Sequence, residues 1–134
     1  MNCTMHSFGA VVAACGIYYL GNKLGVELNP IYLVAGSVSG GLIPDIDHPK
    51  SKMGKMMQPI SVLIMAIVGH RTLTHSLLFS IIIGILVGMI NLSLGVGIFF
   101  GILSHIILDL LTSNTNGVAF LYPFYKKRIR VVKY

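Results

Sequence analysis

The chain has 134 residues, of which 54% are hydrophobic and only 10% charged, and its mean hydropathy is +0.81. Soluble domains carry about a quarter charged residues, so the composition excludes an ordinary soluble fold and indicates one integral membrane domain over residues 1–134. The formal net charge of +6 arises from ten Lys and Arg against four Asp and Glu.

The first two apolar stretches predict a helical hairpin with spans at 6–21 and 29–43. A spanning helix needs about 20 residues, and these stretches reach that length only when their polar ends are included. These helices are therefore expected to begin or end at membrane depth.

Residues 44–75 are predicted to form an insertion at one membrane face. Its apolar stretch lies between Pro59 and His70, and at ten residues it is too short to span. We expect a re-entrant or interfacial helix at about 59–69.

A second hairpin is predicted from spans at 76–91 and 94–113, joined by a tight turn, and a basic juxtamembrane tail follows at 123–134. The predicted fold is thus an all-α membrane bundle of four spanning helices. Aromatic residues within the basic tail would also suit nucleic acid, but beside so apolar a body we favour anionic lipid headgroups and expect no nucleic acid.

This topology puts nine of the ten basic residues on the same face as both termini. The excess of Lys and Arg in cytoplasmic loops then predicts a multi-pass protein of the cell (inner) membrane with cytoplasmic N- and C-termini.

Pairs of glycines four residues apart occur in the apolar helices, for example Gly36 and Gly40. Such pairs allow close helix contact, which we expect mainly within one chain, although an oligomer through these faces stays open.

All histidines and aspartates fall in four short clusters, and four spans would bring every cluster to the cytoplasmic helix ends. Ionisable groups at membrane depth are costly and usually pair or bind a ligand. If these residues were only polar residues at the helix ends, Asn, Gln, Ser and Glu would be expected among them. The selection of Asp and His therefore favours metal binding. The candidate metal ligands are His6, Asp45, Asp47, His48, His70, His75, His105 and Asp109.

The spacing of these residues suits metal ligands. Asp45, Asp47 and His48 lie between two prolines that favour an extended or turn conformation. His105 and Asp109 are four residues apart and share one helix face. Eight candidates exceed the ligands of one zinc ion, so two divalent ions are predicted, with other candidates supporting the ligands. Zinc is favoured, and manganese or iron would also accept these donors.

The predicted catalytic residues are Asp45 or Asp47 as general base and Arg71 as the holder of an anionic group. A guanidinium binds phosphate in a bidentate manner, but an interfacial arginine that extends to the headgroups is an equally good interpretation of Arg71.

Four blocks carry a resemblance to a known family: His6-Ser7; Gly41-Leu42-Ile43-Pro44-Asp45-Ile46-Asp47-His48-Pro49; His70-Arg71, Thr74-His75-Ser76; and Ser104-His105, Asp109 and Thr112. In this order they resemble the YdjM-type inner-membrane proteins over about residues 4–125. The family is described as membrane-bound metal-dependent hydrolases, so the resemblance implies an enzyme without naming a substrate. A more distant pattern is similar to zinc-dependent phospholipase C.

The leading hypothesis is a metal-dependent hydrolase that uses a metal-activated water on a phospholipid or other membrane-borne phosphoester at the cytoplasmic leaflet. Two alternatives remain. The first is a non-catalytic adaptor whose helices are held together by metal. The second is a metal or ion transporter. It is less favoured, because the His and Asp clusters are expected at one membrane face only, whereas a transport path must cross both halves of the bundle.

Overall fold

The computed structural model describes residues 3–111 and 117–131, and the named elements within them are helical, as the sequence predicted. Thr112 at the end of the last predicted span and Lys133 of the tail lie outside the described residues. The elements are α1 (Cys3–Lys23), α2 (Pro30–Leu42), the 3₁₀ helix η1 (Ile43–Asp47), α3 (Lys52–Met56), α4 (Gln58–Val68), α5 (Leu77–Gly88) and α6 (Leu92–Leu111).

Within the described residues, α1 and α6 are the two helices long and apolar enough to cross a membrane. Helices α2 and α5 have 13 and 12 residues, so each rises only about 20 Å, less than the roughly 30 Å of a hydrocarbon core. Spanning by all four helices therefore stays a prediction. Helix α4 coincides with the short helix predicted at 59–69.

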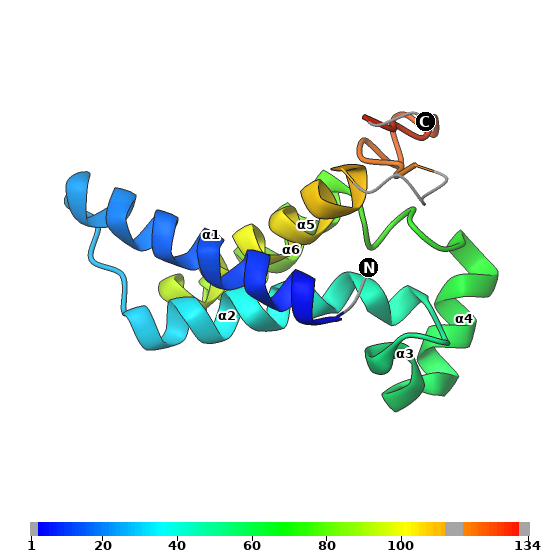
Figure 1. Ribbon diagram of the computed structural model, residues 1–134, viewed down its shortest axis with the longest axis horizontal. Coiled ribbons are helices and arrows are strands. Elements are labelled where there is room, and N and C mark those ends of the chain that lie inside the picture. Colours follow the sequence, from blue (N-terminus) through cyan, green and yellow to red (C-terminus); the bar gives the residue numbers. More distant parts are fainter. Residues whose placement is uncertain (1–2, 112–116, 132–134) are drawn as a thin grey trace.

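Figure 1 shows α1 and α2 running antiparallel beside α5 and α6, with α3 and α4 set apart as an arm next to the end of α2. Helix α6 contacts α1, α2 and α5, so it is the central helix of the body. The arm is connected to this body mainly through η1, which contacts both α3 and α4. The segment that carries Asp45 and Asp47 is thus held between two helical units.

The close contact of α2 with α6 depends on glycine. A Cβ added at Gly36 or Gly40 would overlap backbone atoms of α6, and one added at Gly97 or Gly101 would overlap backbone atoms of α2. Such small faces let helix backbones approach closely in lipid, where dispersion and polar contacts drive association. These glycines are therefore used for packing within one chain.

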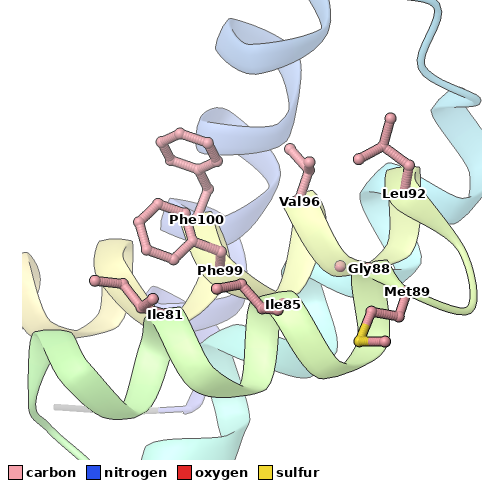
Figure 2. Close-up of a pocket in the computed structure, with 10 residues that line it drawn as sticks. Ile81, Ile85, Gly88, Met89, Leu92, Val96, Phe99 and Phe100 are labelled. Atoms are coloured by element: carbon pink, nitrogen blue, oxygen red, sulfur yellow. The ribbon is translucent and has the colours of Figure 1, made fainter.

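The contact of α5 with α6 also involves glycines and leaves an apolar hollow of about 470 Å³ on the outside of this pair. Figure 2 shows Phe99 and Phe100 of α6 beside Ile81 and Ile85 of α5, with Gly88 at the closest approach of the ribbons. Exposed Met89 and Ile90 continue the apolar surface at the end of α5.

Candidate metal centre

Helices α1 and α6 bring together three buried side chains: His6, His105 and Asp109. One potential ligand atom from each lies within 4.8 Å of the others. The rings of His6 and His105 stack with centroids 3.7 Å apart, and His6 Nε2 lies 3.8 Å from Asp109 Oδ1. The i, i+4 spacing of His105 and Asp109 directs both toward α1, and the small residues Ala10 and Gly41 let α1 and α2 approach at this level.

The hydrogen bonding of His105 leaves a nitrogen lone pair directed into this group. Its Nδ1 lies 2.7 Å from the carbonyl oxygen of Gly41 and must donate, because a carbonyl only accepts. Its Nε2 faces Asp45 Oδ1 at 3.8 Å and Asp109 Oδ2 at 3.9 Å. These distances are too long for hydrogen bonds, which span about 2.7–3.2 Å. They suit two ligands on one ion, whose donor atoms lie about 3.4 Å apart at the tetrahedral angle and about 4.2 Å apart when opposite.

The same reasoning applies to His75 at the start of α5. The Thr74 hydroxyl donates to Asp47 Oδ2 at 2.5 Å, so its oxygen accepts from His75 Nδ1 at 3.0 Å. Nε2 of His75 is the ring nitrogen on the side of Asp109 and lies 3.4 Å from Asp109 Oδ2. The Nε2 atoms of His75 and His105 thus converge on one carboxylate.

Asp47 is completely buried and accepts hydrogen bonds instead of facing a cavity. Its Oδ1 lies 2.5 Å from His70 Nδ1, and its Oδ2 accepts from the backbone N–H of Arg71 at 2.9 Å and from Thr74. Burial alone would raise the pKa of Asp47, but the hydrogen bonds from His70, His75 and Thr74 together lower it well below its usual range. Asp47 is thus a carboxylate that fixes the orientation of histidine rings, as carboxylates do behind metal ligands.

Asp45, His48 and His70 lie toward the open side of the cluster. Asp45 is partly buried, and this burial raises the pKa of its carboxyl group. His48 and His70 stack with ring centroids 4.7 Å apart, and burial together with the neighbouring His70 lowers the pKa of His48. Through these contacts all eight predicted ligands join one connected cluster, although His48 and His70 do not lie within ligand distance of the three-residue group. Metal binding by each residue stays a prediction.

Arg71 lies across the centre with a strained backbone. Its φ of 61° is in the left-handed region, which costs about 1–3 kcal/mol for a residue with a side chain and marks functional positions. Its Nε lies 3.1 Å from Asp109 Oδ2. Its backbone is held on both sides, by Asp47 as described and by the N–H of Ala119, which donates to its carbonyl at 3.1 Å.

The contact with Ala119 belongs to a C-terminal strap, residues 117–131, that the sequence did not predict as part of the site. The guanidinium of Arg128 donates to the carbonyl of His70 at 3.1 Å, and the carbonyl of Phe120 accepts from the N–H of Leu77. A bridge between Val118 and Ile129 closes the strap. The basic residues of this segment did not predict these contacts, because an arginine or lysine binds lipid headgroups and protein carbonyls equally well.

A pocket of about 600 Å³ opens directly beside the cluster. Its lining combines the candidate ligands with cationic side chains from the segment after η1. The lining residues are Cys3, Thr4, His6, Asp45, His48, Lys50, Ser51, Lys52, His70, Arg71 and Asp109. A ligand in this pocket would touch both metal-ligating and cationic groups.

Replacing Asp47 by Asn is expected to weaken metal binding by about 10–100-fold while the chain stays folded, because the amide cannot hold His70 and His75 in their present tautomers. Affinity is measured by competition with a chelating dye. Glu27→Gln makes the same chemical change at an exposed position and should leave affinity unchanged. Equal affinity in the two variants would contradict the orienting role of Asp47.

Fold and site together define a helical membrane protein with a buried His and Asp group that could hold a metal ion. Residues 1–134 match the model of the YdjM inner membrane protein family, and the chain belongs to this family. It is 35% identical over 122 residues to the uncharacterized protein YvsG of Bacillus subtilis (strain 168), covering 88% of this chain and 71% of YvsG.

The chain is also 34% identical over 124 residues to the inner membrane protein YdjM of Escherichia coli (strain K12), and it matches the YdjM of Shigella flexneri equally well. These alignments cover 82% of this chain and 60% of each relative. No solved structure matches the chain. The likeness to zinc-dependent phospholipase C rests on the sequence pattern alone.

Proposed function

We propose that this protein is a metal-dependent hydrolase that acts on a phospholipid or another membrane-borne phosphoester at the cytoplasmic leaflet. One observation carries the proposal. The buried group of His6, His105 and Asp109 adjoins an open pocket that also contains Lys50, Lys52 and Arg71. Metal ligands and cations in one cavity suit an anionic substrate whose reacting group must reach an ion.

His6, His105 and Asp109 form the ligand set in this proposal, which leaves the fourth position of a tetrahedral ion for water or substrate. Two imidazoles and one carboxylate suit zinc best, with manganese and iron as alternatives. The contacts of Asp47 with His70 and His75 support it as their orienting partner. A second ion would use donors of the outer part of the cluster around His48 and His70.

The chain's own groups supply the remaining functions. When bound, a divalent ion supplies Lewis-acid polarisation of the phosphoester and activation of water. Asp45 lines the pocket with one oxygen 3.8 Å from His105 Nε2, and its raised pKa makes it the stronger base of the two predicted aspartates. Arg71 adjoins Asp109 and can bind phosphoryl oxygens with its terminal nitrogens. Lys50 and Lys52 attract the anionic headgroup.

The open pocket favours a hydrolase over the two alternatives. A structural metal site is closed by protein ligands, whereas a catalytic site keeps an accessible position. Here His6 and Asp109 both line the pocket. An ion conduit would need a polar path through the bundle. Among the described residues, the group around Asp109 is the candidate ion site, and it lies at one end of α6.

The proposal is tested with purified protein in vesicles of phosphatidylglycerol and phosphatidylethanolamine. Bound metals are measured by elemental analysis, and lipid products by mass spectrometry. We expect zinc in the protein and time-dependent release of a phosphorylated headgroup or of phosphate, which Asp45→Asn abolishes while metal is retained. Bound metal with no change in the lipids or in a panel of phosphoesters would instead support the adaptor.

Replacing Arg71 by Ala is expected to keep the metal and to lower turnover by about 100-fold or more, the usual loss for a group that stabilises developing charge. Arg71→Lys should recover part of this activity, because it keeps the charge but loses the bidentate geometry. Metal content and initial rates are measured on the same preparations. Loss of metal in Arg71→Ala would make the ion pair with Asp109 structural.

A further inference from the structure

The 3₁₀ helix η1 separates two cavities of opposite character. Three residues per turn place every third side chain on the same face. Ile43 and Ile46 therefore share one face of η1 and line an apolar slot of about 250 Å³, whereas Asp45 and the following residue His48 line the polar pocket. The third face carries buried Asp47. One short segment thus forms a wall of both cavities.

The apolar slot lies between η1, α4 and the start of α5. Its lining residues are Ile43, Ile46, Ile64, Ile67, Val68, Leu73, Thr74 and Phe79. The hydroxyl of Thr74 is already bound to Asp47 and His75, so the slot offers only hydrocarbon. A stable water needs about 2–4 polar partners, and the slot is therefore not a water site.

The surroundings of the slot identify its occupant. Within α4, which is described completely, Ser61 is the buried residue, and apolar side chains such as Leu63 and Ile67 are 58% and 72% exposed. A short helix that is apolar on every side belongs at or in the lipid. The slot is too small for a partner helix, whose diameter with side chains is about 10–12 Å. A linear hydrocarbon chain fits both its size and its chemistry.

We propose that this slot takes an acyl chain of the lipid whose headgroup enters the polar pocket on the other face of η1. The identity of this lipid as substrate rests on the proposed function, but occupancy of the slot does not require turnover. The arrangement selects amphiphilic phosphoesters, because a soluble phosphoester would bind only the polar pocket. Ile46 and Ile64 are then specificity residues, and α4 covers the bound chain.

The test uses phosphatidylglycerol with a photoactivatable diazirine on one acyl chain, incorporated into vesicles with the metal-loaded protein. In the unmodified protein, labelled peptides should include Ile46, Ile64 or Leu73. Ile64→Trp should fill the slot and reduce this labelling about tenfold, the loss expected when roughly two methylenes lose their burial. Leu63→Trp adds the same ring on the exposed side of α4 and should not change labelling.

Labelling confined to other peptides of the unmodified protein would contradict acyl-chain binding in the slot. This outcome does not depend on whether any variant folds. Equal labelling in the two Trp variants, or crosslinks to a second copy of the chain at these residues, would do the same. Ile64→Trp should also lower hydrolysis of phosphatidylglycerol while sparing bis(p-nitrophenyl) phosphate, which has no acyl chain. Slot labelling without any hydrolysis would refute the enzyme and leave the lipid site standing.

Discussion

Asp109→Asn is expected to remove the bound metal, with an affinity loss of at least about 100-fold. The carboxylate is the centre on which the other groups converge: His75 Nε2 lies 3.4 Å from it, His105 Nε2 3.9 Å, His6 Nε2 3.8 Å and Arg71 Nε 3.1 Å. The amide has the same shape and therefore preserves the packing of α6, but it lacks the charge that offsets both cation and guanidinium. Metal content is measured by elemental analysis after dialysis against a weak chelator.

The matched control for this variant is Ser104→Ala. Ser104 lies on α6 next to His105, but its hydroxyl donates to the carbonyl of Gly101 within the same helix. Its loss should leave metal content and thermal stability unchanged. If Asp109→Asn keeps its metal as firmly as this control, the proposed ligand group is wrong and the hydrolase proposal loses its basis.

Gly36→Ala is expected to destabilise the bundle by about 1–3 kcal/mol or more, because an added Cβ would overlap the backbone carbonyl of Leu94. Neither partner atom can rotate away, so α2 and α6 must separate. The effect is measured as a lower midpoint of thermal unfolding in detergent, with helicity followed by circular dichroism.

Gly16→Ala is the control for this prediction. Gly16 lies in α1, and a Cβ there would meet nothing within 4 Å. Because alanine has the higher helix propensity, the unfolding midpoint should stay the same or rise slightly. Equal unfolding midpoints for Gly36→Ala and Gly16→Ala would show that the α2–α6 contact does not limit stability.

The sequence determined the helical membrane class. Its low charge content and long apolar stretches indicate a lipid environment, where backbone N–H and C=O groups must form their hydrogen bonds within the protein, as in a helix. It also indicated the short helix near 59–69, since its flanking Pro59 and His70 bound the apolar stretch. The four His and Asp clusters could be singled out because costly residue types at helix ends are seldom incidental.

Only the tertiary structure separated the roles within those clusters. Asp45 and Asp47 are nearly equivalent by sequence, yet η1 turns Asp47 into the protein, where it accepts from His70 and Thr74, and turns Asp45 toward the pocket. In an extended chain, two side chains two residues apart point to the same side, whereas in a 3₁₀ helix they point to different sides. The residue types alone do not show which of the two conformations the segment adopts.

The strap of residues 117–131 was also beyond sequence reasoning. The N–H of Ala119 donates to the carbonyl of Arg71, and any residue type supplies such a backbone group. The guanidinium of Arg128 donates to the carbonyl of His70, but an arginine in a basic tail is equally expected at lipid headgroups. The sequence therefore determined which side chains have the chemistry of a metal site. The packing of α1, α2 and α6, set by close glycine contacts, decided which of them face a common centre, because that depends on distances between segments far apart in the chain.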